Sequence, residues 1–232
     1  MKSVLVTGGT VRLGKAIAAR LRAECWRVIT SSHRADAGAD IIADLAEPMG
    51  PAKLYAAAMK ILGGNPPDAL VNNAALFTGD AAAITAVNLE APKKLTMLMA
   101  GRETGVGAVV NILDSGVAGL RGCEVAGLRG CEVAGLRSCE VAGLGTYLDS
   151  KRALLDFTRS AAATFAATLR VNAVAPGPVL APTDVHVKAG ETLLDRRPTA
   201  DDVAAAVSYL LDAESTTGAI IPVDAGQHLL ET

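Results

Sequence analysis

The chain has 232 residues, 50% of them hydrophobic and 20% charged, and its formal net charge is −2. That length suits one large domain, and this composition excludes a disordered or fibrous chain. The pI of about 5.9 lacks the basic surplus of nucleic-acid-binding proteins, so no nucleic-acid partner is predicted.

The sequence predicts neither a membrane span nor an export signal. No apolar run approaches the roughly 18 residues of a membrane span. The segment Met1–Val6 carries one lysine and a short apolar run that ends at Thr7 and Gly8. This pattern favours a buried first strand over a signal peptide, so we expect a cytoplasmic protein with reduced thiols. The three histidines are scattered, and we predict no metal site.

Short apolar runs alternate with longer helical patterns along the chain. The expected strands, in chain order, are Val4–Val6, Arg27–Thr30, Ile41–Ala43, Ala69–Asn72, Ala108–Leu113, Arg170–Ala175 and Ala219–Val223. The expected helices are Leu13–Glu24, Ala52–Leu62, Ala82–Met99, Tyr147–Ala167 and Ala200–Asp212, the last with Thr199 as its N-cap and Asp202 three residues on. Continuous apolar strands are typical of a parallel sheet buried on both faces. The alternation predicts a doubly wound, Rossmann-like α/β fold in a single domain.

One segment interrupts this alternation. The eight residues Val117–Glu124 recur as Val125–Glu132 and Val133–Glu140, and a further copy starts at Val141. Three copies of so short a period are too few for a solenoid, so the pattern indicates a duplicated loop, an insertion at about 117–144. It is either a tolerated surface insertion or a lid or partner-binding arm.

The first expected strand runs into a glycine turn and then into a helix. Thr7, Gly8, Arg12, Leu13 and Gly14 follow the spacing T-G-x-x-x-G-x-G, with Arg12 at the middle glycine. Backbone N–H groups at a helix start, with glycines that allow close approach, can bind the pyrophosphate of a dinucleotide. Methyltransferases also place glycine in such a turn.

The residues after the second expected strand predict the cofactor. Ser32, His33 and Arg34 come there, and no acidic residue appears before Asp36. An acidic residue would bind the ribose 2′-hydroxyl of NAD, whereas arginine accepts the 2′-phosphate of NADP. Arg34 together with Arg12 therefore predicts NADPH/NADP.

Two further strand ends are expected to contact this cofactor. Asp44 and Leu45 follow the third expected strand and could touch the adenine edge. Asn73, Ala74 and Ala75 follow the fourth, and such small residues let cofactor and strand approach each other.

Tyr147 and Lys151 are four residues apart, so they share one face of an expected helix. A nearby ammonium favours the phenolate, so the pKa of Tyr147 is expected to fall from about 10 toward the working pH. Lys151 could also hold the nicotinamide ribose. The pair is common by chance and gains weight from its place downstream of the glycine turn.

Taken together, these motifs resemble the short-chain dehydrogenase/reductase family over nearly the whole chain. The matching segments are Thr7–Gly14, Asp44–Leu45, Asn72–Ala75, Val87–Leu89, Asn111–Asp114, Tyr147–Lys151, Arg170–Asn172, Pro176–Pro178 and Val223–Gly226. Arg12, His33 with Arg34, and Asp114 are similar to the pteridine reductase and dihydromonapterin reductase branch of that family.

The resemblance implies residue roles. Tyr147 would be the general acid, Lys151 would lower its pKa and bind ribose, and Asn88 would hold a water in the proton relay. The nicotinamide carboxamide would be lined by Pro176, Gly177 and Val179.

The residue on the substrate side has two candidates. The family usually has serine three residues after the fifth-strand asparagine, and counting from Asn111 that position is Asp114, followed by Ser115. Pteridine reductases carry aspartate there, so Asp114 resembles their proton-relay residue. The alternative gives the substrate hydrogen bond to Ser115.

These features predict an NADPH-dependent reductase of a small carbonyl or pterin-like imine, and by resemblance a homotetramer or dimer. The alternative is an NADP(H)-binding sensor or scaffold whose repeat loop obstructs the site. A third hypothesis, a methyltransferase, explains the glycine turn but not Tyr147 with Lys151.

Overall fold

The computed structural model describes residues 1–103, 105–118, 144–179 and 191–230. The repeat expected at about 117–144 therefore lies almost wholly outside the described residues, and so does His186.

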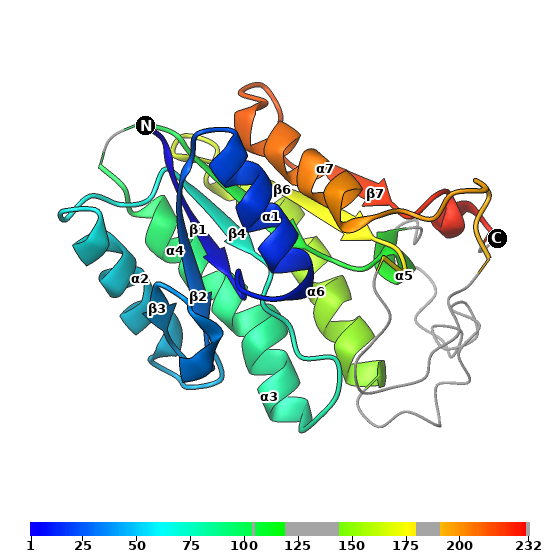
Figure 1. The fold of residues 1–232 in the computed structure, drawn as a ribbon, viewed down its shortest axis with the longest axis horizontal. Helices are drawn as coiled ribbons and strands as arrows, with labels where there is room; N and C mark the ends of the chain where they lie inside the picture. Colours follow the sequence, from blue (N-terminus) through cyan, green and yellow to red (C-terminus); the bar gives the residue numbers. More distant parts are fainter. Residues whose placement is uncertain (104, 119–143, 180–190, 231–232) are drawn as a thin grey trace.

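One parallel sheet forms the centre of the molecule, with the strand order β3-β2-β1-β4-β5-β6-β7 (Figure 1). The strands are β1 (Ser3–Thr7), β2 (Arg27–Ser32), β3 (Ile41–Ile42), β4 (Ala69–Asn72), β5 (Gly107–Ile112), β6 (Leu169–Pro176) and β7 (Ile220–Val223). All neighbouring strands run parallel. The predicted doubly wound α/β fold is confirmed.

Helices cover both faces of this sheet (Figure 1). The long helices are α1 (Arg12–Ala23) and α7 (Ala200–Asp212) on one face, and α2 (Gly50–Ile61), α4 (Ala91–Ala100) and α6 (Leu144–Thr164) on the other. The short ones are η1 (Ala35–Ala37), α3 (Ala81–Thr85), η2 (Ala86–Glu90), α5 (Ser115–Ala118) and η3 (Gln227–Leu229). Successive residues of β1 alternate between the two cores: Leu5 packs toward α2 and α4, and Val4 and Val6 pack toward α1 and α7.

The expected helix Ala82–Met99 is not continuous. The chain forms α3, then one π-helical turn, η2, and then α4. Pro92 lies at the start of α4 and has no backbone N–H, so it cannot donate the hydrogen bond that a continuing helix requires. A wide turn in this position changes which side chains face α6, and it places Asn88 inside the protein, where it is 0% exposed.

The predicted N-cap of α7 is a complete capping box. The Thr199 hydroxyl accepts a hydrogen bond from the Asp202 N–H at 3.2 Å, and the Asp202 carboxylate accepts one from the Thr199 N–H at 2.8 Å. Arg196 adds a two-point ion pair with Asp202. The hydrogen bonds from Arg196 and Thr199 hold the pKa of Asp202 well below its usual range.

Among the described residues, the helices are all too short or too polar to cross a lipid bilayer. The same residues contain no group of three or more His, Cys, Asp or Glu side chains arranged to hold a metal ion.

Thr199→Ala is expected to lower the free energy of unfolding by about 1 kcal/mol, because the N-terminal N–H groups of α7 lose their side-chain acceptor. Urea denaturation measures the change. Ser215→Ala is the control, since Ser215 is an exposed residue in the turn after α7. Equal stability of the two variants would contradict the role given to this cap.

Candidate active site

The glycine turn between β1 and α1 lies tightly against the end of β4. The Thr7 hydroxyl accepts hydrogen bonds from the N–H groups of Asn73 at 2.9 Å and Ala74 at 3.0 Å. The Asn73 amide donates to the Thr7 and Gly8 carbonyls at 2.9 and 3.1 Å. A Cβ on Gly14 would stand 2.1 Å from the Gly8 carbonyl oxygen. The close backbone approach therefore requires glycine at 14.

Two features of this turn fit a bound phosphate group. The hydroxyl oxygen of Thr10 is buried, and it has no hydrogen-bond partner within the described part of the chain. Arg12 occupies the left-handed region with φ of 49°, a conformation that glycine adopts freely and that costs other residues about 1–2 kcal/mol. A strained arginine and an unpartnered hydroxyl at the start of α1 suit an anionic ligand.

The residues at the end of β2 and directly after it form hydrogen bonds with each other. The Ser32 hydroxyl accepts a hydrogen bond from the Arg34 N–H at 3.0 Å. The Arg34 guanidinium binds both oxygens of Asp36, at 3.1 and 2.9 Å, and both side chains are exposed. A phosphate at this strand end would compete with Asp36 for Arg34. The sequence contains Asp36, but it gives no sign that the carboxylate folds back onto Arg34.

Tyr147, Asp114 and Lys151 meet at the carboxyl end of β5. The Tyr147 hydroxyl donates to Asp114 Oδ2 at 3.0 Å, and the Gly116 N–H donates to Asp114 Oδ1 at 2.9 Å. Lys151 Nζ donates to the Ile112 carbonyl at 2.8 Å and lies 5.7 Å from the centre of the Tyr147 ring. Tyr147 is 8% exposed and Lys151 3% exposed. A phenol, a carboxylate and an ammonium thus share one mostly buried site.

The expected fall in the pKa of Tyr147 is wrong for this arrangement. Its pKa lies well above the usual value, because the phenol is buried and its hydroxyl faces the Asp114 carboxylate. The Lys151 ammonium points to the Ile112 carbonyl instead of to the phenol oxygen. Burial lowers the pKa of Lys151 to about 8, against the opposing effect of Asp114.

Ser115 faces away from this group. Its hydroxyl lies 3.5 Å from Gln227 Oε1 in η3, at the limit of a hydrogen bond. Of the two candidates for the substrate side, Asp114 is therefore the one in contact with Tyr147.

The side-chain amide of Asn88 makes three hydrogen bonds inside the protein. Its amide N–H groups donate to the Leu76 carbonyl at 2.9 Å and to the Ser150 hydroxyl at 3.2 Å. Its carbonyl oxygen accepts from the Leu76 N–H at 2.8 Å. Through these three bonds Asn88 connects the loop after β4 to α6, and its role toward a relay water stays a prediction.

Comparisons with known proteins agree with this fold. A family model described as enoyl-(acyl carrier protein) reductase matches residues 130–228. The protein named as ketoacyl reductase 2 of the granaticin polyketide synthase of Streptomyces violaceoruber is 31% identical, over 97% of this chain and 96% of its own length. A short-chain dehydrogenase/reductase structure from Serratia marcescens aligns with a TM-score of 0.73 and 27% identity, over 98% of this chain and 97% of that one.

The chain belongs to the short-chain dehydrogenase/reductase family.

Another similar structure is FolM alternative dihydrofolate reductase 1 from Brucella canis, crystallised with NADP. It aligns with a TM-score of 0.77 and 31% identity, over 98% of this chain and 94% of that one. The similarity agrees with the pteridine-reductase-like branch that Arg12 and Asp114 indicate.

The other expected contact residues of this short-chain reductase lie at the same edge of the sheet. Leu45 is buried in the core, and Asp44 accepts a hydrogen bond from the Ala46 N–H at 2.8 Å. Gly177 follows β6 and packs on Asp224, where an added Cβ would stand 2.7 Å from the Asp224 Cβ. The structure also describes three more of the expected contact residues, Ala75, Pro176 and Val179.

Sequence reasoning missed two side chains that contact Tyr147. The Phe77 ring lies 4.8 Å from the Tyr147 ring, centre to centre, at an angle of 59°. The Ser150 hydroxyl donates to the Tyr147 carbonyl at 2.6 Å. No periodic pattern marks Phe77, which lies in a loop, whereas the place of Ser150 directly before Lys151 could have drawn attention to it.

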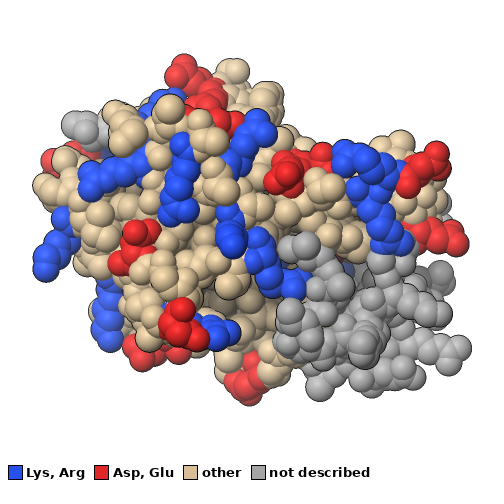
Figure 2. Space-filling model, in the orientation of Figure 1, with Lys and Arg blue, Asp and Glu red and all other residues tan. Residues whose placement is uncertain are grey.

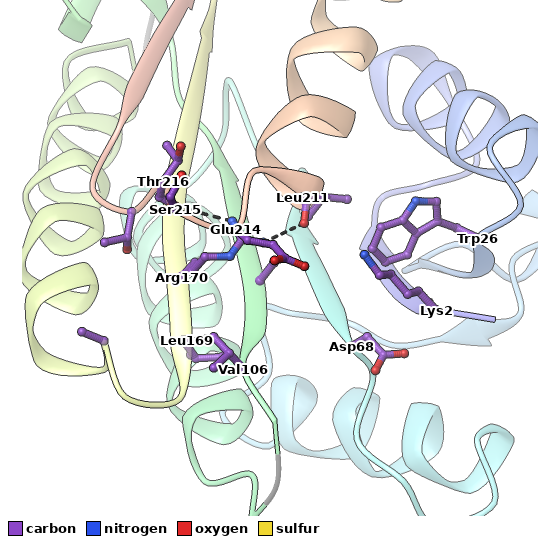
Figure 3. Close-up of a pocket in the computed structure, with 13 residues that line it drawn as sticks. Lys2, Trp26, Asp68, Val106, Leu169, Arg170, Leu211, Glu214, Ser215 and Thr216 are labelled. Carbon is purple, nitrogen blue, oxygen red and sulfur yellow. Dashed lines mark hydrogen bonds between the residues drawn. The ribbon is translucent and has the colours of Figure 1, made fainter.

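A separate hollow of about 620 Å³ opens at the amino ends of the strands, at the opposite edge from Tyr147 (Figure 3). Its basic groups are used within the chain. Arg170 donates to the carbonyls of Leu210, Leu211 and Ala213 at 2.9, 2.7 and 2.8 Å, and Lys2 pairs with Asp212. These contacts hold the end of α7 in place, so we do not assign this hollow to the candidate active site.

Basic side chains are not confined to the glycine turn. Figure 2 shows Lys and Arg spread over the face that carries α1 and α7, with Asp and Glu between them. That face therefore carries charges of both signs.

Gly14→Ala is expected to lower the free energy of unfolding by about 1–3 kcal/mol, because the new methyl group collides with the backbone at Gly8. Urea denaturation measures the loss. Gly101→Ala is the control, since a Cβ there meets its nearest atom at 3.5 Å, an ordinary contact. If the Gly14 variant matched it in stability, the glycine turn would be less tightly packed than described.

Proposed function

We propose that this protein is an NADPH-dependent oxidoreductase that reduces a small carbonyl or pterin-like imine. The observation that carries the proposal is the buried Tyr147 hydroxyl, hydrogen-bonded to Asp114 at 3.0 Å, with Lys151 on the same helix face. A phenol in such a place can deliver a proton to a substrate oxygen or nitrogen from which water is excluded.

The cofactor assignment rests on the glycine turn and on the relatives. Thr7, Gly8, Thr10, Arg12 and Gly14 form the turn that would hold the pyrophosphate. The similar Brucella canis reductase was crystallised with NADP. When bound, NADPH supplies the hydride of the reduction.

The chain's own residues supply and balance the proton. Because the pKa of Tyr147 is raised, its phenol is protonated at neutral pH and serves as the acid. Donating that proton leaves a phenolate in a buried site, and the Lys151 ammonium is the nearby positive charge that stabilises it. Asp114 is half-buried and bonded to the same hydroxyl, so it can return a proton from solvent to Tyr147.

The substrate class follows from Asp114. A carboxyl group at the position of the usual family serine suits a substrate nitrogen that needs a proton, as in a pterin-like imine, and the likeness to FolM agrees with this. We also propose a cytoplasmic homo-oligomer, a dimer or tetramer, in which α4 and α6 pair across subunits as the resemblance implies.

The test is NADPH oxidation with a panel of pterins, quinones and diketones, run beside cofactor binding measured by fluorescence. Turnover of a panel member with preference for NADPH over NADH is the expected result. Turnover that prefers NADH would refute the cofactor assignment.

A second candidate is favoured by the repeat at 117–144, which separates Asp114 from Tyr147 in the chain. It is an NADP(H)-binding sensor or scaffold whose site the repeat obstructs. Binding of NADPH without turnover of any panel member would favour this candidate. Binding of S-adenosylmethionine without NADPH would favour a methyltransferase.

A pH prediction follows from Lys151. The reductive kcat/KM, which reports the free enzyme, is expected to fall as pH rises through about 8, because Lys151 then loses the charge that stabilises the phenolate. Asp114 raises the pKa of both Lys151 and Tyr147. Asp114→Asn is therefore expected to move this midpoint to lower pH by about one unit.

The matched control is Asp149→Asn, which removes an exposed carboxylate from α6, the helix that carries Lys151. Its pH midpoint is expected to stay at the wild-type value. An unchanged or higher midpoint in Asp114→Asn would contradict the coupling between these groups. If Asp114→Ala keeps full activity while Ser115→Ala loses it, Ser115 is the residue on the substrate side.

A further inference from the structure

Two hydroxyl groups on the buried face of α6 are held in the same way. Ser150 and Thr158 lie two helical turns apart and are 4% and 0% exposed. Each accepts a hydrogen bond from an asparagine of another element, and each donates to a carbonyl one turn earlier in α6. Neither residue belongs to the site predicted from the sequence.

The Thr158 contact ties α6 to the middle of the sheet. Asn111 of β5 donates to the Thr158 hydroxyl at 2.9 Å, and Thr158 donates to the Leu154 carbonyl at 2.7 Å. Asn72 of β4 donates to Asn111 at 2.8 Å, which extends the chain of hydrogen bonds by one strand. Asn111 is paired at both ends of its amide, whereas Asn72 Oδ1 has no partner among the described residues, and the network links the middle of α6 to β5.

The Ser150 contact ties α6 to the loop that flanks the candidate site. The Asn88 amide donates to the Ser150 hydroxyl at 3.2 Å, and Ser150 donates to the Tyr147 carbonyl at 2.6 Å. Asn88 is itself bonded twice to the Leu76 backbone, next to Phe77, whose ring packs on Tyr147. The backbone of Tyr147 and the ring beside its phenol are therefore set by one connected group.

We propose that Ser150 is a positioning residue for Tyr147. It fixes the first turns of α6 against η2, so that the phenol stays at hydrogen-bond distance from Asp114. This inference rests on the proposed function, in which Tyr147 is the acid. The Ser150 hydroxyl is bonded to the Tyr147 carbonyl on one side and to the Asn88 amide outside the helix on the other, so it restricts the turn that carries the phenol. Displacements of about 1 Å at such a group cost orders of magnitude in rate.

Thr158 provides the matched comparison. It makes the same two kinds of contact on the same helix, but two turns away from Tyr147. Removing either hydroxyl leaves an asparagine N–H without its acceptor in a buried place, so both changes are expected to destabilise the protein. Only the Ser150 change is expected to disturb Tyr147.

The kinetic test compares Ser150→Ala with Thr158→Val in the full chain, using the panel substrate that the wild type turns over. In Ser150→Ala, kcat is expected to fall about tenfold while the KM for NADPH stays within about twofold, because the glycine turn is untouched. Thr158→Val is expected to lower the melting temperature and leave kcat near the wild-type value. Equal losses of kcat in the two variants, or none in Ser150→Ala, would overturn the proposal.

A second readout does not depend on turnover. In a Tyr55→Phe/Tyr209→Phe background, 3-fluorotyrosine labels Tyr147 alone, because the chain has three tyrosines. Ser150→Ala is expected to shift or broaden the single fluorine resonance, whereas Thr158→Val leaves it in place. If the resonance responds in this way but the wild-type protein turns over no panel member, the proposed function is disproved and the positioning role is retained. A resonance that both variants leave unmoved would disprove the positioning role.

Discussion

The burial of both faces of a parallel sheet is the constraint on which the rest of the molecule depends. Strands covered by α1 and α7 on one side and by α2, α4 and α6 on the other admit few polar side chains. Two of the asparagines that do enter, Asn72 and Asn111, are bonded to each other and then to Thr158. A third, Asn172 of β6, binds the Thr216 carbonyl and the Ala219 N–H. Asn111 likewise uses both ends of its side-chain amide, so its hydrogen bonds connect the middle of α6 to the centre of the sheet.

The end of β4 joins the two halves of the candidate site. Asn72 belongs to the chain of hydrogen bonds that reaches α6, while the next residue, Asn73, donates to the Thr7 and Gly8 carbonyls of the glycine turn. Consecutive side chains of a strand point to opposite faces, so one strand end can hold the turn beside α1 and the helix that carries the phenol. A shift of β4 would therefore disturb the anion-binding turn and the proton donor together.

The fold and the members of the site could be predicted because their signals are local. Continuous apolar runs mark the strands, the glycine turn marks the start of α1, and Thr199 with Asp202 marks the start of α7. What failed depends on contacts between distant residues. Asn88 in η2 bonds to Leu76 and Ser150, and the pKa of Tyr147 is raised by burial and by the Asp114 carboxylate that its hydroxyl faces. Spacing places Tyr147 and Lys151 on one face, but it does not say that the ammonium points to a backbone carbonyl.

In the proposed reduction, the protonation states of this site suit the step in which Tyr147 gives up a proton. Reduction consumes a proton and needs a protonated phenol, whereas oxidation needs a phenolate to remove one. Burial and Asp114 both keep Tyr147 protonated at neutral pH. Asp114 also opposes the effect of burial on Lys151, so the carboxylate supports the charge that the phenolate requires after it has given its proton. A single carboxylate at the usual serine position thus raises the pKa of both Tyr147 and Lys151, a coulombic effect that a neutral serine hydroxyl would not supply.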